Sequence, residues 1–132
     1  MSTHISGPFD VKMAPQGSDP AEGGSTLARF ALEKTYHGAL TATAKGEMIS
    51  AVTSVKGSAA YSAIERVDGT LDGRRGTFVL QHTGVMDRGA PSLVISVVPD
   101  SGTGELAGLS GTMNIVIEAG KHSYEFDYRL ND

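Results

Sequence analysis

The chain has 132 residues, and its 11 basic and 15 acidic side chains give a formal net charge of −4 at pH 7. This length suits one domain, residues 1–132, and the acidic balance offers no electrostatic footprint for nucleic acid. The absence of cysteine excludes disulfides, thiolate metal sites and a cysteine nucleophile. No apolar run reaches membrane-spanning length, and residues 1–8 lack the pattern of a signal peptide, so we expect a cytoplasmic protein that does not bind membranes.

The first half of the chain alternates polar and apolar residues with the period of two that is typical of β-strands. A first strand is expected over Phe9–Met13, between Pro8 and Pro15, and the glycine-rich segment Gln16–Ser25 is expected to be a loop. Further strands are predicted over Thr26–His37, Leu40–Ile49 and Ser58–Val67, the last ending at a turn at Asp68-Gly69. Within the first of these, Leu27–Lys34 alone is also compatible with a short helix.

A second turn is predicted at Asp72–Gly76, followed by a strand over Thr77–Thr83. The segment Leu93–Val98 is almost continuously apolar, which indicates a strand covered on both faces. A small barrel buries only one of these faces. We therefore expect the outer face, Val94, Ser96 and Val98, to be covered by a loop or by another subunit, and we favour a homo-oligomer.

The segment Val98–Gly111 contains four glycines between two β-rich runs. Gly102-x-Gly104-x-x-x-Gly108 superficially resembles a nucleotide-binding loop, but such a loop must open a helix whose N-terminus faces the phosphates. The following residues, Thr112–Ile117, alternate and are rich in β-branched side chains, so they predict a strand instead. We interpret the segment as a tight corner of a β-structure, where glycine permits close approaches of the backbone.

The last strand, His122–Leu130, has the clearest alternation, and it brings the total to about eight strands with no confident helix. Short connections and this strand count leave a β-sandwich or a closed barrel. Small residues such as Ala42, Ala44, Ala59 and Ala63 favour the barrel, because bending and tapering strands need them. The predicted fold class is all-β, a single antiparallel eight-stranded barrel.

Five segments carry a resemblance to a known family: Gly57–Tyr61, Ile64–Val67, Gly76–His82, Val97–Leu106 and Lys121–Tyr128. Together they resemble a bacterial family of unknown function whose fold is similar to the allene oxide cyclase barrel, over nearly the whole chain. The glycine corner is shared more loosely with allene oxide cyclases and plant dirigent proteins. The resemblance implies an eight-stranded antiparallel barrel that is usually oligomeric. Neither the catalytic residues nor the characteristic cysteine of the cyclases has a counterpart here, so their activity is not implied.

An eight-stranded barrel is either filled by side chains or holds one small ligand. The candidate site residues are therefore those whose position in the strand alternation points them into the barrel. Glu65 and His82 are the candidate acid or base residues. If Glu65 is enclosed without a cation, burial raises its pKa and makes it a usable general base; the alternative is that it pairs with Arg66 or a neighbouring strand. The candidate ligand-binding residues are Tyr61, His122, Tyr124, Phe126 and Tyr128.

Each of these candidates also has a purely structural interpretation, since the aromatic residues of the last strand suit a core and both histidines suit a barrel rim. No metal and no cofactor are expected, because the four histidines lie in separate segments and no nucleophile elbow is present. Three functions remain open. The barrel binds a small apolar or amphipathic molecule, or it is an isomerase or cyclase using Glu65 or His82, or it is fully packed and acts only as an oligomeric structural protein.

Overall fold

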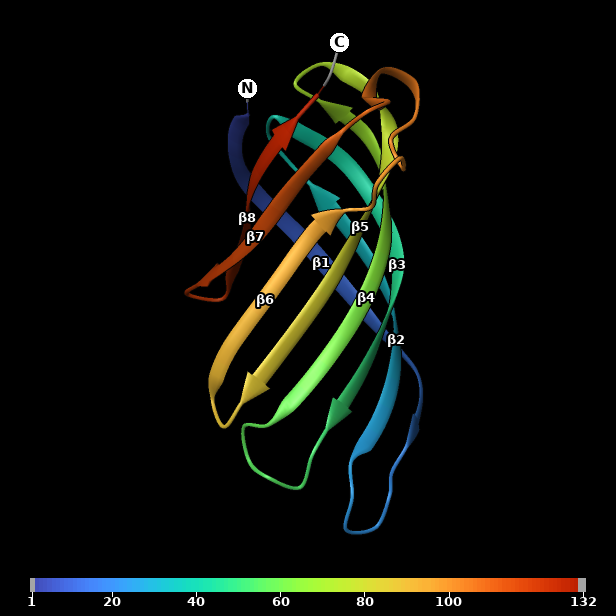
Figure 1. The fold of residues 1–132 in the computed structure, drawn as a ribbon, viewed down its shortest axis with the longest axis vertical. Coiled ribbons are helices and arrows are strands. Elements are labelled where there is room, and N and C mark those ends of the chain that lie inside the picture. Colours follow the sequence, from blue (N-terminus) through green and yellow to red (C-terminus); the bar gives the residue numbers. More distant parts are fainter. Residues whose placement is uncertain (1, 131–132) are drawn as a thin grey trace.

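The computed structural model describes residues 2–130 and consists of eight antiparallel strands that form a closed barrel (Figure 1). Each strand pairs with the next, and β8 pairs back with β1, which confirms the predicted fold class. None of the described residues belongs to a helix long and apolar enough to cross a membrane. The elements are β1 (Thr3–Asp19), β2 (Thr26–Tyr36), β3 (Leu40–Val52), β4 (Ala59–Leu71), β5 (Arg74–Asp87), β6 (Ala90–Val97), the 3₁₀ turn η1 (Gly104–Leu106), β7 (Ser110–Glu118) and β8 (Lys121–Arg129).

Several predicted strand boundaries were wrong. Neither Pro8 nor Pro15 bounds the first strand, because β1 runs from Thr3 to Asp19 with an irregularity in its register between Pro15 and Gly17. The predicted loop Gln16–Ser25 therefore begins only after Asp19. Asp68-Gly69 is not a turn, because β4 continues to Leu71 and the chain reverses at Asp72-Gly73 instead. The segment Leu27–Lys34 is strand rather than helix.

The glycine at position 69 serves close packing between strands. A Cβ atom there would lie only 2.2 Å from the carbonyl oxygen of Thr41 on β3, so a side chain does not fit. The true turn takes its conformation from Asp72 and Gly73, with φ angles of 49° and 82°. The sequence therefore contains two Asp-Gly pairs with different roles, one in a ladder and one in a turn.

The glycine-rich segment is a structural corner, as predicted. After β6 the chain folds back onto β5, where the amide of Val98 donates to the carbonyl of Val79 at 2.9 Å and the amide of Thr103 donates to the carbonyl of Thr77 at 2.8 Å. Gly104 adopts a φ of 61° at the start of η1, which favours glycine. The next long element is the strand β7, so the helix that a phosphate-binding loop requires does not follow.

The barrel is closed at one end and open at the other. β7 and β8 have nine residues each, and β6 pairs with β7 through only Ile95–Met113 and Ser96–Thr112. β1 pairs with β8 from Thr3 to Pro8 and thereafter with β2 alone. The β7–β8 hairpin therefore diverges from β6, while β1 to β6 continue past it as a curved sheet (Figure 1). We call the end that carries the β1–β2, β3–β4 and β5–β6 connections the open end.

Large side chains fill the closed end. The rings of Phe78 and Phe126 stack at a centroid distance of 5.9 Å, and both are almost fully buried, as are Leu71 and Leu106. Each such side chain contributes roughly 1.5–3 kcal/mol of hydrophobic free energy. This packed half anchors the strands, so the longer parts of β1 to β6 extend from a fixed base.

The outer face of β2 to β6 carries five exposed apolar side chains. Ile49, Ser62, Thr83 and Val94 pair in one cross-strand row. Val94 is 59% exposed, so no loop covers it. The apolar members of the face are Leu27, Ile49, Ile64, Val85 and Val94.

We expect this outer face to associate with a second copy of the chain, because burying the row would remove apolar surface from water. Val94→Lys should shift the protein towards the monomer in sedimentation velocity at micromolar concentration. Thr43→Lys, a charge added at an exposed position of β3 outside the row, is the control and should leave the distribution unchanged. A wild-type protein that sediments as a monomer would contradict this expectation.

Candidate functional site

Four side chains form a buried polar network in the middle of the barrel. Glu65, on β4, is 1% exposed, and its Oε2 accepts hydrogen bonds from Lys34 Nζ and His82 Nε2, both at 2.7 Å. Its Oε1 accepts a hydrogen bond from the hydroxyl of Tyr36. Both carboxylate oxygens of Glu65 are therefore engaged. Lys34 also lies 5.4 Å from the centre of the Phe9 ring, a favourable position for a cation.

Small residues on β3 allow this network to form. Lys34 and Tyr36 lie on β2, and Glu65 lies on β4, so their side chains meet across β3. Opposite them β3 presents Ala44 and Gly46, and a Cβ atom on Gly46 would come within 2.0 Å of the carbonyl oxygen of Ile64. Gly46 therefore lets the backbones of β3 and β4 approach closely, and Ala44 is a small buried residue beside Lys34.

The network keeps Glu65 ionised. Burial alone would raise its pKa, but the hydrogen bond from His82 and the positive charge of Lys34 outweigh burial and lower the pKa from 4.5 to about 2. Burial, and then the neighbouring Glu65 carboxylate, raise the pKa of Tyr36 well above its usual value. The condition for a basic Glu65, enclosure without a cation, is not met because Lys34 supplies the cation. Glu65 is therefore not suited to act as a general base near neutral pH.

The ionised carboxylate fixes the tautomer of His82. A carboxylate can only accept hydrogen bonds, so the proton of the 2.7 Å contact resides on Nε2 of His82. Within residues 2–130, Nδ1 of the same ring has no hydrogen-bond partner. The side chain of His82 is itself only 2% exposed.

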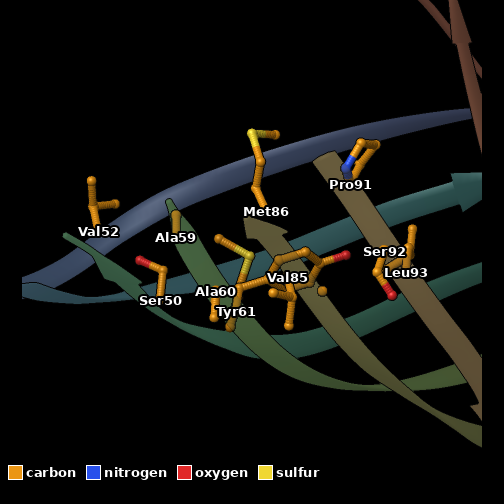
Figure 2. Close-up of a pocket in the computed structure, with 12 residues that line it drawn as sticks. Ser50, Val52, Ala59, Ala60, Tyr61, Val85, Met86, Pro91, Ser92 and Leu93 are labelled. Atoms are coloured by element: carbon orange, nitrogen blue, oxygen red, sulfur yellow. The ribbon is translucent and has the colours of Figure 1, made fainter. Parts of the chain in front are cut away.

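Tyr61 separates His82 from the open end. The rings of Tyr61 and His82 are 6.4 Å apart, and the Tyr61 ring lies over Gly84, where a Cβ atom would be 2.3 Å from Tyr61 Cε1. Figure 2 shows the ring reaching from β4 across β5, with its hydroxyl on the side of β6. Burial, followed by the charge of Glu65, raises the pKa of Tyr61, so its hydroxyl stays protonated.

A hollow of about 320 Å³ begins at Tyr61 and opens at the open end of the barrel (Figure 2). It is predominantly apolar; apart from Tyr61, its only polar side chains are two serines. We call it the apolar hollow. Its lining residues are Met48, Ser50, Val52, Ala59, Ala60, Tyr61, Gly84, Val85, Met86, Pro91, Ser92 and Leu93.

The aromatic residues of β8 lie elsewhere. Tyr124 and Phe126 are fully buried at the closed end, and Tyr128 is nearly so. The hydroxyl of Tyr124 donates to the carbonyl of His37 at 2.7 Å, and that of Tyr128 donates to the Asp72 side chain. These tyrosines therefore tie β8 to two turns, and none of the three aromatic residues lines the apolar hollow.

His122 is half-buried and packs edge-on against Phe9 at 5.4 Å. It borders a separate depression between the start of β8 and β1, which includes Pro8 and Lys121. The structure thus brings Glu65, His82 and Tyr61 together and leaves His122 apart from the hollow. In the described part of the chain, no group of three or more histidine, aspartate or glutamate side chains has metal-site geometry.

Sequence reasoning missed Lys34 and Tyr36 as members of the network. The signal was present, because Lys34 has the same strand parity as Phe30 and Leu32 and is the one charged residue of that face. A lysine whose side chain points into the barrel requires a buried partner of opposite charge, and Glu65 is the acidic residue that was predicted to point inward.

The fold and the site define a class of protein, an antiparallel eight-stranded barrel with an ion-paired network across its interior. The chain belongs to the family described as "Protein of unknown function (DUF3224)", which matches residues 5–128. It is similar to a family member from Shewanella oneidensis MR-1 with a crystal structure and unknown function, at 51% identity, with all of both chains covered and a TM-score of 0.94. No curated protein matches the chain.

We expect Glu65→Gln to destabilise the protein by ~3–5 kcal/mol at pH 7, because it leaves the Lys34 charge buried without its partner. The folded-state pKa of Glu65, about 2, lies below its ordinary 4.5, so its contribution is present above about pH 5 and is lost as the pH falls towards 2. The difference in unfolding free energy between wild type and variant, measured in urea, should therefore shrink over that range.

Asp68→Asn is the matched control, because it removes the carboxylate of an exposed ion pair with Arg75 at 2.8 Å. Its effect should stay below ~1 kcal/mol. Equal destabilisation by the two substitutions would show that the buried network contributes no more to the free energy of unfolding than an exposed ion pair does.

Proposed function

We propose that the protein binds a small apolar or amphipathic molecule in the apolar hollow. The observation that supports this most strongly is the exposure of side chains that have the parity of a barrel interior. Met86 and Val52 face the inner side of the sheet yet are 44% and 54% exposed. Apolar surface on a concave face gains free energy when a ligand covers it.

The size and lining of the hollow suit a small ligand. Its volume of about 320 Å³ falls at the lower end of the roughly 300–1,000 Å³ that small-molecule sites occupy. Two methionines, Met48 and Met86, contribute flexible thioether side chains that adapt to different shapes. The buried network beyond Tyr61 joins β2, β4 and β5 and so holds the strands that carry the hollow in place.

An isomerase is the second candidate, and His82 is the residue that favours it. Glu65 orients the imidazole through Nε2 and leaves Nδ1 free, which is how a carboxylate prepares a histidine base. A bound ketone should then exchange its acidic carbon-bound protons in D₂O faster with wild type than with His82→Gln, as followed by NMR. Equal exchange rates would argue for binding without catalysis.

The binding proposal predicts that wild-type protein binds the neutral apolar dye N-phenyl-1-naphthylamine with an increase in fluorescence. The chain contains no tryptophan, so dye emission is free of that background. Ala59→Phe places a large side chain in the hollow and should weaken binding at least tenfold.

Thr43→Phe adds the same side chain on the outer face of the neighbouring strand β3, outside the self-association row, and should leave the affinity unchanged. Melting temperatures of both variants establish that the fold is retained. Absence of dye binding to wild type, or equal loss in both variants, would contradict the proposal. The first of these results would favour a barrel that acts only through its outer surface.

A further inference from the structure

The hydroxyl of Tyr61 differs from the other tyrosine hydroxyls of this chain, which contains four tyrosines. Each of the others donates a hydrogen bond to a carboxylate or a carbonyl oxygen of the protein; they are Tyr36, Tyr124 and Tyr128. Within residues 2–130, the Tyr61 hydroxyl has no hydrogen-bond partner. Tyr61 therefore carries a donor that the described part of the fold does not use.

The fold places this donor in the wall of the apolar hollow. Tyr61 lines the hollow, and its ring crosses β5 over Gly84, where a Cβ atom would be 2.3 Å from Tyr61 Cε1. Figure 2 shows the hydroxyl at the end of the ring that lies on the side of β6. Burial, followed by the charge of Glu65, raises the pKa of Tyr61, so the hydroxyl keeps its proton at neutral pH and can donate it in a hydrogen bond.

The rest of the lining offers hydroxyl groups but no charge. None of the lining residues is a lysine, an arginine or a carboxylate. The other polar side chains are Ser92 and Ser50, and Ser50 pairs with Tyr61 in the β3–β4 ladder. An ionised head group in the hollow would lose its hydration without gaining an ion pair. The lining therefore favours a neutral ligand.

A ligand that fills the hollow also removes water from the Tyr61 hydroxyl. A buried donor left without a partner costs free energy, whereas a donor that meets an acceptor on the ligand does not. A site with such a donor discriminates against a ligand that is hydrocarbon throughout. Tyr61 thus sets a chemical requirement on whatever occupies the hollow.

We propose that the ligand is a neutral carbonyl compound, a ketone or an ester, whose oxygen accepts a hydrogen bond from Tyr61 while its apolar body fills the hollow. This inference rests on the proposed binding function and adds Tyr61 as the residue that determines specificity. A carbonyl oxygen has two lone pairs and no proton of its own, so hydroxyl donors alone satisfy it. An alcohol would bring a further proton, for which the lining has no carboxylate.

Two ligands of the same shape test the head group: propiophenone and propylbenzene, in which a methylene group replaces the carbonyl. Each is titrated against the bound naphthylamine dye with wild type and with Tyr61→Phe. The substitution should weaken the ketone about fivefold, the equivalent of one ordinary hydrogen bond. It should not weaken the hydrocarbon, which has no acceptor. Each ligand is compared with itself, so the different solubilities of the two in water do not affect the result.

Ser50→Ala is the matched control variant, because it removes the hydroxyl of the residue that pairs with Tyr61. It should leave the affinity for both ligands unchanged, and an equal loss of ketone affinity in this variant would contradict the role of Tyr61. Melting temperatures of the two variants establish that the fold is retained.

The infrared band of the bound ketone, labelled with ¹³C at the carbonyl, reports the hydrogen bond directly. With wild type the band should lie at a lower wavenumber than in hexane, because a hydrogen bond weakens the C=O bond. With Tyr61→Phe it should return to the position it has in hexane.

Two results separate the failure of this inference from that of the proposed function. If the dye and both ligands bind wild type, but Tyr61→Phe weakens the ketone no more than the hydrocarbon or the wild-type band stands at its hexane position, the inference is overturned and the binding function stands. If none of the probes, the dye included, binds wild type, the proposed function fails and this inference fails with it.

Discussion

The ion pair between Lys34 and Glu65 is the constraint on which the interior of this barrel depends. Two charges at 2.7 Å, both nearly inaccessible to water, are tolerable only because every polar atom of Glu65 is satisfied by Lys34, His82 or Tyr36. The contacts join β2, β4 and β5 across the interior. They divide it into a packed closed end and an apolar hollow, and they fix which nitrogen of His82 faces away from the network.

The same network decides the ionisation of Glu65, the candidate acid or base of the sequence analysis. A buried carboxylate becomes a base when burial dominates, but in this barrel the hydrogen bond from His82 and the charge of Lys34 dominate and lower the pKa of Glu65 to about 2. Of the two acid–base candidates, His82 is then the one that the proposed isomerase function relies on. His82 is oriented by Glu65 and lies behind Tyr61, whose ring is 6.4 Å from it.

Most of the fold was predictable from the sequence because strand alternation and glycine positions are local signals. The same parity put Glu65 and His82 on inward faces. What it could not supply was which strands approach each other across the interior, so the meeting of Lys34 and Glu65 over β3 was missed. The strand pattern also did not show that β7 and β8 are too short to close the open end of the barrel. Tyr124, on β8, packs in the core and does not line the hollow.

The central claim, that the open end of the barrel is a binding site and the closed end is scaffold, is tested most directly by methyl NMR of the methionines. Met48 and Met86 line the hollow, whereas Met113 is 1% exposed in the core and serves as an internal reference. Titration with 1-octanol should shift the methyl signals of Met48 and Met86 in a saturable way and leave Met113 in place. Unchanged signals for Met48 and Met86 at saturating octanol would contradict the account.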